Sequence, residues 1–196
     1  MPTTARVLVT HHLTAPCRYF QPGQSSPGRV TPTSPAQDVM TDLRQVSALT
    51  TALNTRADDA LQQMIQGGVK LLLVTDEGRR VLGLLTATDL AGEKPVRVAQ
   101  QLGIKRGDLL VRDIMTPWDR LELIAMEDIE RATVADVVAT LKQTGRQHAL
   151  ALDQCEGQPA IRGLFSATQI GRQLGAAVVT AGKASSFAEL GKAIGA

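Results

Sequence analysis

Two short segments carry the side chains best suited to bind a ligand: Thr86 with Asp89, and Ser166 with Gln169. Thr86 follows an apolar run and opens an expected helix, where free backbone N–H groups and the helix dipole favour a phosphate. Its hydroxyl can donate a hydrogen bond to that phosphate, and the acceptor-only carboxylate of Asp89 can accept from both hydroxyls of a ribose. The first segment therefore predicts recognition of a phosphate and a ribose.

The same pattern has a purely structural interpretation. A hydroxyl followed three residues later by a carboxylate also caps the start of a helix, so both roles stay open for Thr86 and Asp89. Ser166 and Gln169 could cap in the same way, but charge-assisted hydrogen bonds are roughly twice as strong as neutral ones, and Gln169 has no charge. We therefore expect a competent site at Asp89 and a weak or non-binding one at Gln169.

Other candidate binding residues lie near the expected strands. An adenine ring needs an apolar slot with backbone partners. The candidates for that slot are Leu72, Val74, Leu84 and the backbone of residues 53–56, with Thr55 among them. Lys70 and Arg146 precede the first hairpin strand of their units, and His148 lies two residues after Arg146. These cations either meet phosphates in a central cleft or are ordinary solvated charges.

These segments belong to a longer repeat. Asp-Val-Met-Thr at 38–41 recurs as Asp-Ile-Met-Thr at 113–116, and Gly-Leu-Leu-Thr at 83–86 recurs as Gly-Leu-Phe-Ser at 163–166. A drifting offset with insertions in turns is typical of a duplicated fold. Two related halves commonly pack about a pseudo-two-fold axis, and the cleft between them is a natural ligand site.

Each unit is expected to run helix, strand, strand, helix, which gives a mixed fold of the α+β or α/β class with two pseudo-symmetric halves. Apolar spacing predicts helices from 57 to 67 and from 134 to 144, each ended by glycine. Strands are expected at 71–74, 81–85, 148–152 and 160–165, with short helices after Thr86 and Ser166. Further expected elements are a helix from Pro95 to Gly103, strands at 7–9 and 176–180, and a helix after Ser186.

This pattern divides the chain into five parts. They are a Pro/Ser/Thr-rich arm at 1–35, a first unit at 36–92, a helical linker at 93–110, a second unit at 111–175, and a terminal strand and helix at 176–196. Trp118, at the entry to the second unit, is expected to be a packing residue.

Composition narrows the function. The 196 residues include 21 basic and 19 acidic side chains, a net charge of +2, with 3% aromatics, so neither an electrostatic footprint nor a stacking platform for nucleic acid is present. No apolar stretch is long enough for a membrane span, the first residues do not resemble a signal peptide, and a reduced cytoplasmic protein is expected. No nucleophile–base or phosphate-loop motif occurs, so neither an enzyme nor a cofactor is expected. A metal or redox protein using His11, His12 and Cys17 is an alternative that spacing barely supports.

The repeated motifs resemble CBS domains, named after cystathionine beta-synthase, and the pair resembles a Bateman module over residues 36–175. The resemblance implies a regulatory module that binds AMP, ADP, ATP or an S-adenosyl compound between its repeats. It assigns the phosphate to Thr86 and the ribose to Asp89, and it implies a homodimer with a further protein partner. Gln169 departs from the family pattern. A non-binding scaffold that acts through dimerisation and protein contacts is the alternative.

Overall fold

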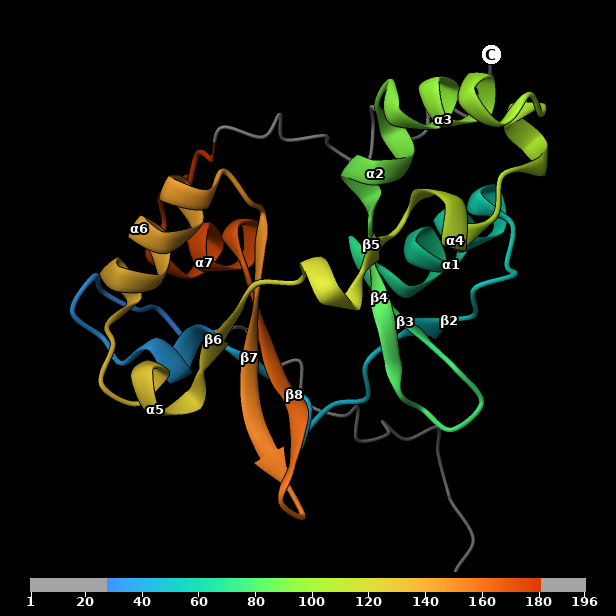
Figure 1. The fold of residues 1–196 in the computed structure, drawn as a ribbon. Helices are drawn as coiled ribbons and strands as arrows, with labels where there is room; N and C mark the ends of the chain where they lie inside the picture. Colours follow the sequence, from blue (N-terminus) through green and yellow to red (C-terminus); the bar gives the residue numbers. More distant parts are fainter. Residues whose placement is uncertain (1–27, 181–196) are drawn as a thin grey trace, which may run out of the picture.

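The computed structural model describes residues 28–180, which form two similar halves lying side by side (Figure 1). Each half contains a four-stranded sheet covered by helices. The strand expected at 7–9, the metal candidates His11, His12 and Cys17, and the helix after Ser186 lie outside the described residues. The mixed α and β architecture with two small sheets is the one that the sequence predicted.

The first sheet has the order β2-β3-β4-β5. Its strands are β2 (Thr50–Thr51), β3 (Leu71–Thr75), β4 (Val81–Thr86) and β5 (Thr116–Pro117). The accompanying helices are α1 (Ala57–Gly67), α2 (Ala87–Ala91), α3 (Lys94–Leu102), η2 (Arg106–Asp108) and α4 (Val111–Ile114). The apolar stripe of α1 is buried, and the helix ends at Gly68, whose φ of 64° is a left-handed conformation that glycine adopts without steric cost.

The second sheet has the order β1-β8-β7-β6. Its strands are β1 (Thr41–Asp42), β6 (Leu123–Ala125), β7 (His148–Cys155) and β8 (Gln158–Ser166). Its helices are η1 (Ala36–Val39), α5 (Met126–Ile129), α6 (Val134–Thr144) and α7 (Ala167–Leu174), and η3 (Trp118–Arg120) connects the halves. Thr133 caps α6: its hydroxyl donates to Asp136 Oδ2 over 2.7 Å, and Asp136 N–H donates back over 3.4 Å. Hydrogen bonds from the Thr133 backbone and hydroxyl lower the pKa of Asp136.

The two Asp-x-Met-Thr segments exchange places between the halves. β1, from the first copy of the motif, pairs with β8, while β5, from the second copy, pairs with β4. In Figure 1 the blue start of the described chain accordingly runs through the half that holds α6 and α7 before the chain crosses to β2. Residues 36–42, which the repeat pattern assigned to the first unit, therefore pack with the second, and the boundaries read from the repeat stay a prediction.

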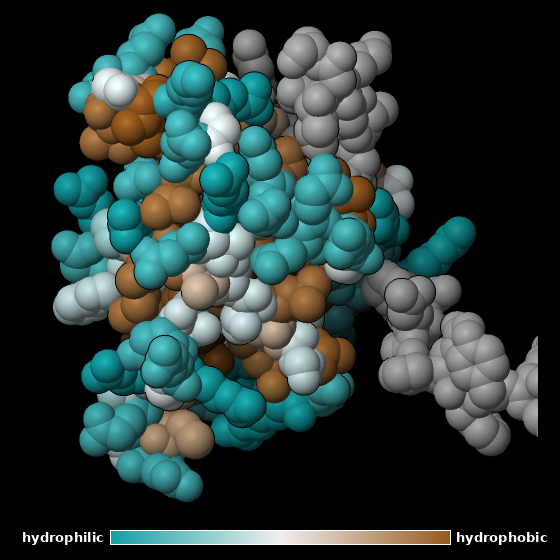
Figure 2. Space-filling view, turned by 90° about the vertical axis from the view of Figure 1, so that its right-hand side faces the viewer, coloured by the Kyte–Doolittle hydropathy of each residue, from teal (hydrophilic) through white to brown (hydrophobic). Residues whose placement is uncertain are grey.

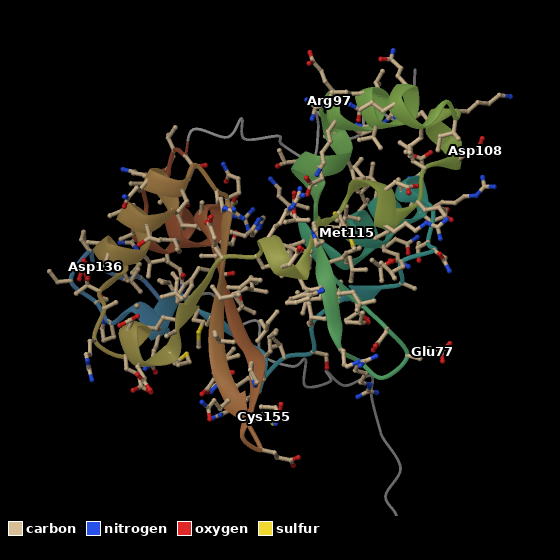
Figure 3. All side chains as sticks on the ribbon, in the orientation of Figure 1. Glu77, Arg97, Asp108, Met115, Asp136 and Cys155 are labelled. Carbon is tan, nitrogen blue, oxygen red and sulfur yellow. The ribbon has the colours of Figure 1, made fainter. Side chains whose placement is uncertain are left out.

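The glycines of the repeated strand motif make this exchange possible. A Cβ on Gly83 would lie 2.5 Å from the Thr116 carbonyl oxygen and 2.9 Å from Met115 Sδ, both closer than van der Waals contact allows. Figure 3 shows Met115 beside β4. A Cβ on Gly163 would similarly lie 2.8 Å from Met40 Sδ and from the Thr41 carbonyl oxygen. In each half, therefore, the strand glycine of one repeat contacts the Met-Thr pair of the other repeat.

Apolar residues between the two sheets join the halves. Leu71, Leu73 and Leu84 are buried there against partly buried residues from both halves, including Leu43 and Leu164. Each half also has its own core beneath its helices. The two halves are consequently held in a fixed relation by apolar burial as well as by the exchanged strands.

Some sequence expectations were wrong. Residues 176–180 form no strand, and Trp118 is 65% exposed in η3 instead of being packed. The two-residue strands β1, β2 and β5 and the three-residue β6 were missed, because such short segments carry no periodicity. No helix among residues 28–180 is long and apolar enough to cross a bilayer. On the face drawn in Figure 2, apolar groups are interspersed with polar ones.

Candidate functional site

The first candidate site is a cavity of about 190 Å³, called here the Asp89 cavity, between the β4–α2 junction and the other half. Thr86 and Asp89 line it from the junction, Thr116 from β5, and Arg146 and His148 from the segment between α6 and β7. Residues far apart in the sequence therefore meet in one concave site. Of the strand-end cations considered from the sequence, Arg146 lines this cavity together with Thr86 and Asp89.

Thr86 and Asp89 form a complete capping box at the start of α2. The Thr86 hydroxyl donates to Asp89 Oδ2 over 2.7 Å, Thr86 N–H donates to the same oxygen over 3.0 Å, and Asp89 N–H donates to the hydroxyl over 3.3 Å. A hydroxyl has one hydrogen to donate. In this conformation that hydrogen is used inside the cap, so the Thr86 hydroxyl does not offer it to a phosphate.

The other oxygen of Asp89 accepts from Lys94, the first residue of α3. Lys94 Nζ lies 2.5 Å from Asp89 Oδ1, and the side chains are 33% and 16% exposed respectively. A partly covered, short ion pair of this kind is stronger than a fully exposed one, because water screens it less. Lys94 was not predicted to belong to the site. Only the turn between α2 and α3 brings it back to the carboxylate, and no spacing in the sequence indicates that contact.

The opposite wall of the Asp89 cavity carries Arg146 and His148. Arg146 Nε lies 3.3 Å from Glu122 Oε2, so this guanidinium already has a partner. Burial, and to a smaller extent the positive charge of Lys70, lowers the pKa of His148 to about 4. His148 is therefore a neutral imidazole near pH 7, able to donate one hydrogen bond and accept another.

The second candidate site, called here the Gln169 cavity, has a volume of about 380 Å³ and occupies the equivalent place in the other half. Ser166 and Gln169 line it from the β8–α7 junction, Thr41 from β1, and Lys70 from the first half. His148 lines both cavities and is thus shared between them.

The polar contacts of the Gln169 cavity differ from those of the first site. Gln169 Oε1 accepts from the Thr41 hydroxyl over 3.3 Å, and Ser166 makes no side-chain cap at α7. The expected capping box of Ser166 and Gln169 was therefore wrong: the exchanged strand β1 brings Thr41 to the amide oxygen instead. Arg172 adds a second cation to this cavity, and none of the residues 28–180 that line it carries a carboxylate.

The loop before β2 forms much of the wall of the Gln169 cavity, and sequence reasoning missed it. The side chains of Leu43, Val46, Ala48 and Leu49 line the cavity from this loop. The loop has no periodicity to draw attention to it. A signal was nevertheless available, since the loop directly follows the first Asp-x-Met-Thr motif.

The residues predicted to form the adenine slot do not lie together at either cavity. Leu84 lines the Asp89 cavity, but Leu72 and Val74 are fully buried in the core of the first half. Thr55 is not among the residues lining these two cavities, and its carbonyl accepts from the N–H of Val111. The described residues contain no group of three His, Cys, Asp or Glu side chains that could hold a metal ion.

Comparison with known proteins agrees with this architecture. The family model for the CBS domain matches residues 36–94. Solved CBS-domain proteins share the arrangement of the chain over both repeats. Residues 36–94 therefore match the CBS-domain model, and the fold of the described residues is that of a CBS-domain pair.

Three solved structures illustrate the likeness of this chain to CBS-domain pairs. A CBS-domain containing protein from Agrobacterium tumefaciens has a TM-score of 0.52 and 17% identity, covering 80% of this chain and 98% of that one. CBSX2 from Arabidopsis thaliana, solved in complex with AMP, has a TM-score of 0.51 and 20% identity, covering 71% and 94%. A CBS-domain pair solved with 5′-methylthioadenosine and S-adenosyl-L-methionine has a TM-score of 0.50 and 18% identity, covering 74% and 98%. No curated protein matches the sequence.

Proposed function

We propose that this CBS-domain pair is a regulatory module that binds an adenosine-containing ligand between its two halves, with the ribose at Asp89. The supporting observation is that the β4–α2 junction opens into a cavity lined from both halves, where Asp89 supplies a carboxylate. A ligand held by both halves stabilises one relative arrangement of them, and its differential affinity for two arrangements sets the size of the response. Two of the similar structures contain AMP or S-adenosyl compounds, which favours this ligand class.

The chemical roles follow from the contacts. Asp89 is 16% exposed, so a hydrogen bond from a ribose hydroxyl to it is only weakly opposed by water. On the facing wall, Arg146, which is paired with Glu122, and the neutral His148 line the same cavity, so a phosphate and neutral polar atoms of the ligand can contact them there. The finer part of the proposal is that this cavity is the competent site and the Gln169 cavity the weaker one, because only the former offers a carboxylate.

The size of the Gln169 cavity favours a second candidate. Its volume of about 380 Å³ falls within the range of roughly 300–1,000 Å³ that is usual for ligand pockets, whereas the Asp89 cavity lies below it. The apolar loop at 43–49 offers a slot for a base, and Lys70 and Arg172 offer positive charge to a phosphate. On this second candidate, the nucleotide binds mainly through its base and phosphate.

Calorimetric titration with AMP, ADP, ATP and S-adenosylmethionine separates these candidates. The proposal expects binding by the wild type that Asp89→Ala abolishes and Gln169→Ala retains. The matched control is Asp136→Ala, which removes a capping-box carboxylate from the outer helix α6, away from both cavities. If Gln169→Ala loses nucleotide binding and Asp89→Ala retains it, the binding site is the Gln169 cavity. Equal loss of binding in both variants would refute the proposed difference between the two cavities.

Absence of binding for all four ligands would support the alternative of a scaffold that acts by dimerisation and protein contacts. In that case the wild type should still form a defined assembly. Light scattering during size-exclusion chromatography measures this directly. The proposal includes a homodimer only as an assembly whose stability depends on the ligand. A dimer that forms equally well with and without nucleotide would not be part of the sensing mechanism.

A further inference from the structure

The ion pair between Lys94 and Asp89 places a fixed positive charge at the point where the proposed ligand binds. One oxygen of Asp89, Oδ2, already accepts from both the N–H and the hydroxyl of Thr86. The other oxygen, Oδ1, accepts from Lys94 Nζ. Since Thr86 uses both acceptor positions of Oδ2 within the helix cap and Lys94 uses one of the two on Oδ1, a ribose that donates both of its hydroxyls to Asp89 must displace the ammonium group of Lys94.

Lys94 is held near the site whichever partner it has. It is the first residue of α3, and Pro95, which follows it, is buried, so the backbone of Lys94 cannot move far without disturbing packing. Its side chain is only 33% exposed, which limits the compensation that water can give to an unpaired ammonium. Displacement by a ribose hydroxyl alone therefore leaves a partly buried positive charge without its counter-ion.

We propose that Lys94 makes the Asp89 cavity selective for adenosine ligands that carry an anionic group near the ribose. This inference rests on the proposed function, in which the ribose binds Asp89. A phosphate on the ribose re-pairs the displaced ammonium, whereas neutral adenosine does not. A sulfonium ligand such as S-adenosylmethionine adds another positive charge beside the ammonium. Arg146 is a poorer partner for the phosphate, because it is already paired with Glu122.

The Gln169 cavity lacks this arrangement. Its amide oxygen accepts from the neutral Thr41 hydroxyl, so a ligand that displaces this contact leaves no charge behind. Any preference for anionic ligands there comes from Lys70 and Arg172. Lys94→Met should consequently change selectivity at the Asp89 cavity alone.

The test compares the dissociation constants of adenosine and AMP by calorimetry. The wild type should bind AMP more tightly than adenosine, and adenosine more tightly than S-adenosylmethionine. In Lys94→Met the preference for AMP over adenosine should fall by about tenfold, because one charge-assisted contact with the phosphate is lost. Adenosine itself should bind more tightly than to the wild type, because its internal competitor is gone.

Two further variants make the result specific. Lys94→Arg keeps the charge and should retain most of the preference, while Lys105→Met removes an exposed lysine that lines neither cavity and should leave both constants unchanged. Thermal unfolding of each variant verifies folding, and Lys94→Gln replaces Lys94→Met if the latter does not fold. The wild-type ligand order is an additional test that needs no variant.

The outcomes distinguish this inference from the function on which it rests. Equal weakening of adenosine and AMP in Lys94→Met, or tighter binding of S-adenosylmethionine than of AMP by the wild type, would overturn the role of Lys94 while leaving the adenosine site in place. Binding of neither adenosine nor AMP to any of these proteins would overturn both.

Discussion

The two cavities occupy equivalent places in the two halves but differ in volume and in charge. The Asp89 cavity measures about 190 Å³, and its carboxylate is held by Thr86 and Lys94. The Gln169 cavity measures about 380 Å³, has no carboxylate among its described lining residues, and is bordered by the loop at 43–49. Duplication therefore fixed the position of a strand-to-helix junction in each half, while the side chains that give each junction its chemistry diverged independently.

The exchanged strands show the same combination of shared backbone and different side chains. Both cross beside a strand glycine, but only β1 has an ionic clamp, in which Arg162 donates to both oxygens of Asp42 over 3.0 and 2.7 Å. Arg162 Nη1 also lies 3.6 Å from Asp153 Oδ2. In the first half the aspartate equivalent to Asp153 is Asp76, and it pairs with the exposed Arg80 within its own hairpin. The second half therefore depends more strongly on charge to hold its exchanged strand.

The glycine contacts should give the largest effect on stability. Gly83→Ala places a Cβ 2.5 Å from the Thr116 carbonyl oxygen, a backbone atom that cannot rotate away, and should lower the free energy of unfolding by about 3 kcal/mol. Gly107→Ala, whose Cβ would have no neighbour within 4 Å, is the matched control. Urea denaturation measures both. Equal stability of the two variants would show that β5 does not depend on this close approach.

The ionic clamp should come next. Arg162→Met leaves Asp42, 16% exposed, without its bidentate partner and should cost about 2 kcal/mol, since a partly buried carboxylate is then uncompensated. Arg80→Met removes the corresponding exposed pair, in which Arg80 is 84% exposed, and should leave the urea midpoint unchanged. A similar shift for both variants would contradict the difference between the two halves.

Gln169→Asp should make the second cavity resemble the first. The new carboxylate would accept from Thr41 and offer a charged oxygen to a ribose, so AMP affinity at this cavity should rise by about tenfold. Calorimetric stoichiometry should then approach two ligands per chain. Gln154→Asp, on the exposed outer part of β7, adds the same charge elsewhere and should not change the stoichiometry. An unaltered titration of Gln169→Asp would show that the missing carboxylate is not what distinguishes the cavities.

His148, the residue shared by both cavities, should give the smallest effect near neutral pH. Its pKa is about 4 in the folded protein and about 6.5 in the unfolded chain, so the unfolded chain binds the proton first. Its contribution to stability is therefore complete above about pH 6.5 and is lost as the pH falls towards about 4. His148→Gln should remove this component from the pH dependence of the free energy of unfolding. Parallel curves for the two proteins would place His148 in solvent instead of between the cavities.

Local patterns in the sequence were sufficient for the longer elements. The stripe from Ala57 to Met64 and the glycine after it specified α1, and the Thr133–Asp136 spacing specified the cap of α6. The repetition of two motifs indicated two halves. These features depend on residues close together in the chain, and for that reason they can be recognised without coordinates.

Tertiary structure decided what surrounds the two junctions. The exchange of β1 and β5 brings Thr41 to the cavity of Gln169 and Thr116 to the cavity of Asp89, so each threonine lies beside the strand-to-helix junction of the opposite repeat. The return of Lys94 to Asp89 likewise depends on how α3 packs after the turn at Gly92. Sequence alone therefore determined which groups can bind a ribose or a phosphate. Only the folded arrangement determined which partners those groups already have, because contacts between distant segments leave no local periodicity.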